Sequence, residues 1–89
     1  MATYYLLIKG KVQGVFYRAS AQEEAEALSL TGWVKNTREG YVEVMVQGDA
    51  EAVRKFIDWC WQGPSRAVVT EVIVTEKEAQ PFDGFRIIR

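Results

Sequence analysis

One segment of the sequence combines a glycine, uncapped backbone N–H groups and an arginine, the components of an anion-binding site. A helix is expected from about Phe16 to Leu28, yet no Ser, Thr, Asp or Asn stands just before it to cap its first N–H groups. Arg18 falls in the first turn, where the helix dipole disfavours a positive charge by about 0.3–1 kcal/mol. A bound anion explains both features, because Gly14 lets the backbone approach closely and Arg18 can donate two parallel hydrogen bonds. A phosphoryl group fits such a cradle best.

A simpler interpretation of the same residues remains open at this stage. Gly14 would then be an ordinary helix cap and Arg18 a solvated surface side chain, because a single glycine-containing loop is a weak signal.

Asn36 is the second candidate, an asparagine of poor strand propensity inside an expected strand. The two-residue repeat of a strand puts it on the same face as Val34, and if that face is covered the amide needs partners. Its carbonyl can accept a hydrogen bond from a water while its NH₂ group donates elsewhere, which would fix a nucleophile in place. The alternative is a strand-end Asn that bonds the backbone of the nearby turn.

The elements that must position these residues are marked by apolar periodicity and turn residues. They are a strand at 4–8, a helix at 16–28, strands at 33–37 and 41–47, a helix between 49 and 63, and a strand at 68–75. The tail at 82–88 either adds a short edge strand or packs over the sheet. This order predicts an α+β fold, a ferredoxin-like βαββαβ open-faced sandwich with an antiparallel sheet and two helices on one face.

Local signals support the second half of this pattern. Val42, Val44 and Val46 alternate with residues of other types, so the valine face should be the core. Asp49 is placed to cap the second helix, and Gly63, followed by a proline, is placed to end it.

Composition narrows the function further. The 89 residues predict a single domain, 1–89, and the balance of 11 Lys and Arg against 12 Asp and Glu gives no general attraction to nucleic acid or to an anionic membrane. There is no His, so the commonest general base is missing, and one cysteine without His does not predict a metal site. The lone Cys60 fits a reducing compartment, and no targeting or membrane-spanning segment is seen, so a cytoplasmic protein is expected.

Two stretches of the chain resemble the signatures of the acylphosphatases, namely residues 12–18, VQGVFYR, and residues 32–37, GWVKNT. The likeness runs through nearly the whole chain and implies the fold predicted above. It also implies the family's activity, hydrolysis of carboxyl-phosphate mixed anhydrides without a metal or cofactor. By position, the resemblance implies that Arg18 and Asn36 are the catalytic residues, Arg18 as the residue that binds phosphate and Asn36 as the residue that positions water. The substrate-binding cradle is Gly14, Val15, Phe16, Tyr17 and Arg18.

Two positions depart from the family's usual pattern. Tyr17 stands where Phe is usual, and Ser29 stands where Gly is usual at the end of the first helix. A tyrosine hydroxyl needs a partner when buried, and a serine in a left-handed cap is strained. Both departures therefore affect the expected rigidity rather than the expected activity.

Hydrolysis of a carboxyl-phosphate anhydride is compatible with a site that has so few functional groups. A carboxylate, with a conjugate-acid pKa of about 4, leaves without a general acid. The implied partner is a small acyl phosphate, with no nucleic acid or membrane partner, and a monomer is expected.

Rival interpretations are a ferredoxin-like module that binds a nucleotide, RNA or a regulatory ligand, and a catalytically silent partner domain. The strand at 41–47 lacks the aromatic and basic signature of an RNA platform, and no CxxC pair supports a copper carrier.

Overall fold

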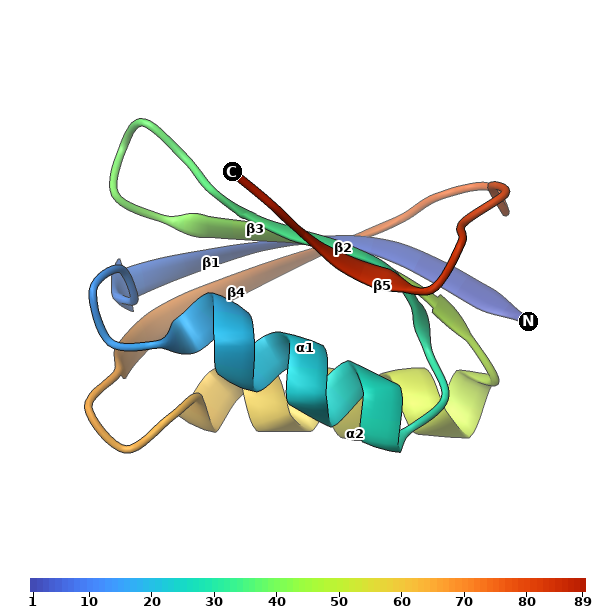
Figure 1. Cartoon of the computed structure of the whole chain (residues 1–89), viewed down its shortest axis with the longest axis horizontal. Coiled ribbons are helices and arrows are strands. Elements are labelled where there is room, and N and C mark those ends of the chain that lie inside the picture. The colour runs from blue at the N-terminus through green and yellow to red at the C-terminus, as the bar shows by residue number, and fades with distance from the viewer.

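The structure is a computed structural model that describes all of residues 1–89. Seven elements follow one another along the chain, with the helices on one side of a twisted sheet (Figure 1). Their bounds are β1 Ala2–Lys11, α1 Tyr17–Ala27, β2 Thr31–Asn36, β3 Val42–Gly48, α2 Ala50–Gln62, β4 Val68–Glu76 and β5 Phe85–Ile88. The predicted βαββαβ order is confirmed, and the tail forms the edge strand β5, the first of its two predicted arrangements.

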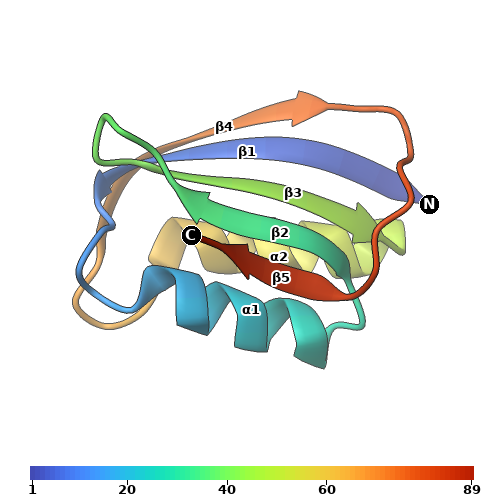
Figure 2. The same ribbon diagram turned by 45° about the horizontal axis from the view of Figure 1, so that its top comes forward.

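The five strands form one sheet in the order β4-β1-β3-β2-β5. All neighbouring strands are antiparallel except one pair, because β5 runs parallel to β2 at the edge of the sheet (Figure 2). This pair departs from the antiparallel sheet expected from the sequence. The chain leaves β4 at the opposite edge and crosses one end of the sheet in residues 77–84, so it enters β5 from the end at which β2 begins.

The core lies between the sheet and the two helices. The valines of β3 that were predicted to face it are fully buried, and they pack with one face of β1, β2 and both helices. Asp49 caps α2 through a bond from the Ala52 N–H, and Gly63 ends the helix with a φ of 65°. Neither helix is long and apolar enough to cross a membrane.

The outer face of the sheet is partly covered, which the alternating pattern of β3 did not predict. Gln47, on this face, is 7% exposed, and its side chain both donates to and accepts from the backbone of Gln80 at 2.8 Å. Thr3 donates to the same amide oxygen. These bonds hold the crossing segment that delivers β5 to the edge of the sheet.

Helix α1 ends in a motif that requires a left-handed residue. The Leu30 N–H donates to the Ala25 carbonyl and the Ser29 N–H to the Glu26 carbonyl, the paired bonds of a Schellman motif. Ser29 has a φ of 58°, so the strain expected from a non-glycine residue at this position is present.

Ser29→Gly is therefore expected to stabilise the protein. The left-handed conformation disfavours serine by about 1–2 kcal/mol, and the greater freedom of glycine in the unfolded chain offsets part of this gain. We expect the free energy of unfolding to rise by about 0.5–1 kcal/mol, measured by urea denaturation. Ser29→Ala is the matched control, because alanine keeps the strain and should give no gain. An equal gain in both variants would contradict this explanation.

Candidate functional site

The loop between β1 and α1 is anchored by two buried valines and bends at the residues between and after them. Val12 and Val15 are buried in the core, whereas Gly14 and Phe16 are exposed and both have positive φ, 75° and 64°. Residues of alternating handedness turn their N–H groups toward a common concavity. Nothing lies within 4 Å of the place where a Cβ on Gly14 would be, so its backbone is open to a ligand.

This loop leaves a run of donors without acceptors. Phe16 is the N-cap of α1 and makes no side-chain cap bond, and no acidic residue lies in the first turn. Within the chain, no hydrogen bond uses the backbone N–H groups from Gly14 to Ala19. The missing cap expected from the sequence is thus confirmed, and the interpretation of Gly14 as an ordinary cap is wrong, because Phe16 occupies that position.

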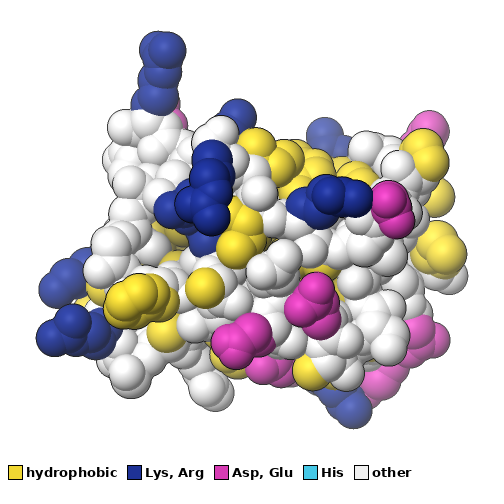
Figure 3. All heavy atoms as spheres, viewed as in Figure 1, with side chains coloured by type: hydrophobic (Ala, Val, Ile, Leu, Met, Phe, Trp, Pro, Cys, Tyr) yellow, Lys and Arg dark blue, Asp and Glu magenta, His cyan; other side chains and the backbone are white.

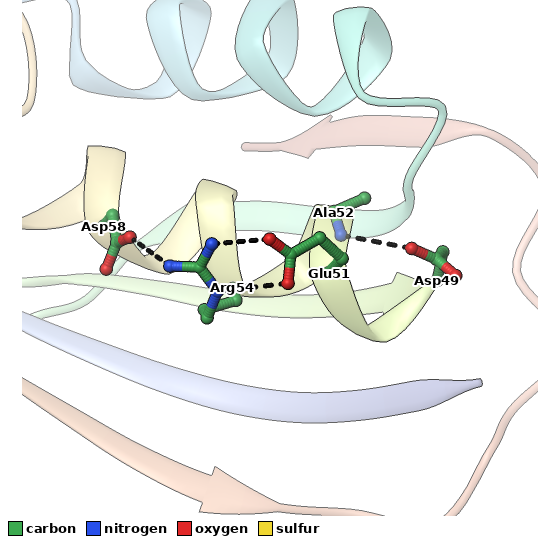
Figure 4. A network of polar contacts seen from close by, with 5 residues as sticks. All are labelled: Asp49, Glu51, Ala52, Arg54 and Asp58. Atoms are coloured by element: carbon green, nitrogen blue, oxygen red, sulfur yellow. Dashed lines mark hydrogen bonds and ion pairs between the residues drawn. The ribbon is translucent and has the colours of Figure 1, made fainter.

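Arg18 lies in the first turn of α1, and no carboxylate contacts it. The contrast is Arg54 on α2, which donates to Glu51 at 2.6 Å and to Asp58 at 3.1 Å (Figure 4). Arg18 is half-buried, and its guanidinium keeps all its donors. A half-buried arginine beside free N–H groups, with no anion in the chain to balance it, is suited to bind an external anion.

Asn36 ends β2 on the face of the fully buried Val34, as the alternation predicted. Its side chain makes no hydrogen bond within the chain, so the alternative of an asparagine that bonds the turn is wrong. The amide lines a hollow of about 310 Å³ together with the exposed loop residues and Arg18. Its residues are Val12, Gly14, Phe16, Tyr17, Arg18, Ala19, Asn36, Ile87 and Arg89.

The structure therefore brings most of the candidates from the sequence to one place. Gly14, Phe16, Tyr17, Arg18 and Asn36 line the hollow, although they come from segments about twenty residues apart. Val15 is the exception, since its side chain is buried in the core and only its backbone belongs to the loop. The arrangement can hold a tetrahedral anion against the start of α1 and present an amide to it.

Two hydrogen bonds that join the two halves of the site come from Gln13, a residue to which the sequence assigned no role. Its amide nitrogen donates to the carbonyls of Thr37 and Tyr41, at 2.9 and 2.8 Å. Gln13 thereby provides a donor for these two carbonyls of the turn after β2, and the side chain of Asn36 stays unbonded. A glutamine in a loop can reach many acceptors, so its type alone does not predict these two bonds. Its position next to Gly14 was the only signal in the sequence.

Two further lining residues that sequence reasoning missed are Ile87 of β5 and Arg89, which directly follows that strand. The register pairs Val34 of β2 with Ile87, so the end of β5 lies beside the end of β2 (Figure 2). The signal was the alternation that begins at the buried Phe85, but the partner strand and its direction were needed to place it.

A second hollow, of about 590 Å³, lies on the outer face of the sheet near the β2–β3 hairpin. It is lined by Lys9, Lys35 and Arg38, but also by two carboxylates, Glu39 and Glu43. Tyr5 donates to Glu43 at 2.6 Å, and burial, followed by this hydrogen bond, raises the pKa of Tyr5 to about 12. Carboxylates repel a phosphoryl dianion, so this hollow is the poorer anion site although it is larger.

Tyr17, the residue where the family usually has Phe, finds a partner for its hydroxyl. It donates to the backbone carbonyl of Cys60 at 2.7 Å. This carbonyl is one of the last four of α2, and the last four carbonyls of a helix have no N–H donor within that helix. This bond joins the start of α1 to the end of α2. Burial raises the pKa of the Tyr17 hydroxyl, and it also raises that of the Cys60 thiol to about 12.

Tyr17→Phe is expected to lower stability and to keep activity. The change leaves a buried carbonyl without its donor, which costs about 1–2 kcal/mol, while the ring and its packing on Trp59 remain. Urea unfolding should show this loss, and steady-state kinetics should show turnover within about twofold of the parent. A large drop in turnover at unchanged stability would mean that the hydroxyl acts in the site.

Comparison with known proteins settles which family has this arrangement. A model of the acylphosphatase family matches residues 4–87. The chain belongs to the acylphosphatase family. The acylphosphatase of Marinobacter nauticus is 48% identical over 84 residues, which cover 93% of this chain and 91% of the relative. That of Albidiferax ferrireducens is 49% identical over 85 residues, covering 96% and 91%.

Solved structures agree. The crystal structure of acylphosphatase from Bacillus subtilis matches with a TM-score of 0.97 and 34% identity, over 100% of both chains. The resemblance stated from residues 12–18 and 32–37 is thereby confirmed, and the chain is an enzyme of the acylphosphatase family.

Proposed function

We propose that the protein hydrolyses the carboxyl-phosphate bond of acyl phosphates to carboxylate and inorganic phosphate without a metal. In this mechanism, Arg18 and the backbone N–H groups of residues 14–18 bind the phosphoryl group, and Asn36 positions the attacking water. The observation that supports it best is the combination, in one hollow, of a run of unbonded N–H groups, an unpaired arginine and an unbonded amide.

The bound phosphoryl group would be held at its equatorial oxygens. Phosphoryl transfer passes through a loose transition state in most analyses, so catalysis consists of positioning and of stabilising charge on those oxygens. The forked guanidinium of Arg18 and the N–H groups supply fixed positive charge for this purpose, partly shielded from water. No covalent intermediate is needed.

The attacking water would be oriented by the carboxamide of Asn36. A water held in line with the breaking bond has already lost its translational freedom, and such placement can remove up to about 7–11 kcal/mol of barrier. As the water oxygen bonds to phosphorus, the bridging P–O bond breaks and the carboxylate leaves with the electron pair. A phosphate oxygen takes the water proton, so the products of the dianion are RCOO⁻ and H₂PO₄⁻ and no basic side chain is required.

In this proposal, the single domain of residues 1–89 carries out the hydrolysis as a monomer in the cytoplasm. The hollow is lined by residues of the β1–α1 loop, α1, β2, β5 and the residue after β5, which together offer a complete cradle for a phosphoryl group. Analytical ultracentrifugation at working concentration should then give a single 10.1 kDa species that has full activity.

The deciding experiment is hydrolysis of acetyl phosphate by protein treated with a chelator, with p-nitrophenyl phosphate as the monoester control. We expect cleavage of the anhydride alone, because an alkoxide or phenoxide leaves less easily than a carboxylate and the site offers no general acid. In water labelled with ¹⁸O, the label should enter phosphate and not acetate. Equal cleavage of the monoester, activity lost with the chelator, or label in acetate would overturn the proposal.

A further inference from the structure

The cradle and the amide of Asn36 belong to segments that meet at one end of the sheet, where the strand pairing stops. The register of β1 with β3 ends at Ile8 and Val42, and that of β2 with β3 ends at Asn36 and Val42. Past these pairs, the β1–α1 loop and the turn after β2, residues 37–41, have no strand pairing that sets the distance between them. That distance decides where the amide of Asn36 lies relative to the cradle.

The turn after β2 keeps its own shape without the loop. The Thr37 N–H donates to the Tyr41 carbonyl at 2.9 Å, and the Gly40 N–H donates to the Thr37 carbonyl at 3.3 Å. The Tyr41 N–H donates to the Thr37 hydroxyl oxygen at 3.1 Å. The turn nevertheless projects from the body of the molecule (Figure 1, Figure 3). Its position relative to the loop therefore depends on a contact between the two segments.

One side chain makes the hydrogen bonds between the two segments. The amide nitrogen of Gln13 donates to the carbonyls of Thr37 and Tyr41. No other hydrogen bond joins residues 12–16 to residues 36–41. Both carbonyls already accept an N–H from within the turn, so Gln13 is not needed to give them a first partner. The two bonds therefore add a fixed spacing between the segments.

Gln13 is placed to affect the reaction without touching the substrate. It directly precedes Gly14, the first residue of the cradle. One of its acceptors, Thr37, directly follows Asn36. Gln13 itself does not line the hollow. A displacement of about 1 Å between reacting groups can cost about 10²-fold in rate, so a change in this spacing is large enough to slow the reaction.

We propose that Gln13 is a positioning residue, which holds the amide of Asn36 at the distance from the cradle that in-line attack by water requires. This inference rests on the proposed function for the role of Asn36, and it adds a residue that acts through Asn36. The cradle keeps other anchors when Gln13 is changed, because Val12 and Val15 are buried in the core. Loss of Gln13 should therefore disturb the placement of water more than the binding of phosphate.

The test is Gln13→Met, which keeps the length of the side chain and removes its donors. We expect kcat for acetyl phosphate to fall about tenfold, while the inhibition constant of inorganic phosphate stays within about twofold of the parent. Gln13→Asn is the second variant, since it keeps an amide but shortens the side chain by one carbon, and it should give the same pattern.

Asp49→Ala is the matched control for stability. It removes the cap of α2, directly after the opposite end of β3 and outside the hollow. We expect it to lower the midpoint of urea unfolding and to leave kcat unchanged. A loss of kcat in Asp49→Ala as large as in Gln13→Met would mean that the effect of Gln13 is one of general stability, and the inference would be wrong.

A double-mutant cycle with Asn36→Ala tests whether Gln13 acts through Asn36. Gln13→Met should lower the rate about tenfold in the parent and less than about twofold in the Asn36→Ala background. Single turnovers with enzyme in excess keep the slow variants measurable. An equal effect in both backgrounds, a kcat equal to that of the parent in both Gln13 variants, or phosphate affinity lost together with kcat would overturn the inference. Failure of the proposed function is seen separately, as a parent protein that does not hydrolyse acetyl phosphate.

Discussion

Arg18→Lys is expected to lose nearly all turnover although it keeps the positive charge. The half-buried Arg18 has no partner in the chain, and the planar fork of its guanidinium can donate two parallel bonds to a phosphoryl group. An ammonium is a point charge on a flexible stem and cannot reproduce that geometry. We expect kcat/KM for acetyl phosphate to fall about 10²-fold or more in Arg18→Lys, and below detection in Arg18→Ala.

The control for this series is Arg54→Lys. Arg54 is also a helical arginine, but it is exposed, paired with Glu51 and Asp58, and outside the hollow (Figure 4). It should keep full activity, while circular dichroism and urea unfolding should show that all variants fold. Inorganic phosphate should inhibit Arg18→Lys much more weakly than the parent. Full activity with unchanged phosphate affinity in Arg18→Lys would contradict the bidentate cradle.

The fold could be predicted because its signals are local and agree with one another. The valine face of β3, the Asp49 cap and the Gly63 stop each act within a few residues, and each is found where the sequence put it. The missing cap of α1 was equally local, since the absence of a capping side chain before the helix is read directly from the chain. In the structure, Phe16 occupies the N-cap position in a left-handed conformation and makes no side-chain cap bond.

The remaining features depend on pairings between segments that are far apart in sequence. Strand β5 has four residues, and its alternation fixes which side chains share a face but not which strand it joins or in which direction. The contribution to the hollow of Ile87, and of Arg89 directly after the strand, could not be foreseen for that reason. The same holds for Gln13, whose two acceptors lie more than twenty residues away along the chain.

These long-range contacts account for how the loop and the strand end of the site are held together. Gln13 fixes the turn after β2 against the β1–α1 loop, and Tyr17 fixes the start of α1 against the end of α2. These bonds are made by the side chains of Gln13 and Tyr17, and the N–H groups of the cradle stay unbonded. The residues that interact with the substrate therefore make few bonds within the chain, and their neighbours make those bonds in their place.

Asn36→Ala tests this division directly. The carboxamide of Asn36 makes no hydrogen bond within the chain, so its removal should change the free energy of unfolding by less than about 1 kcal/mol. The proposed partner of the amide is the attacking water and not the phosphoryl group. We therefore expect kcat for acetyl phosphate to fall about 10²-fold or more, while the inhibition constant of inorganic phosphate stays within about twofold of the parent.

Lys35→Ala is the matched control for this prediction, because Lys35 precedes Asn36 on β2 but is exposed on the opposite face of the sheet. It should keep kcat and phosphate affinity near those of the parent. If Asn36→Ala instead weakened phosphate binding as much as it lowered kcat, Asn36 would be a ligand of the phosphoryl group. The separation of the two constants is the observable that distinguishes a residue that holds water from one that holds substrate, since only the former contributes after phosphate is bound.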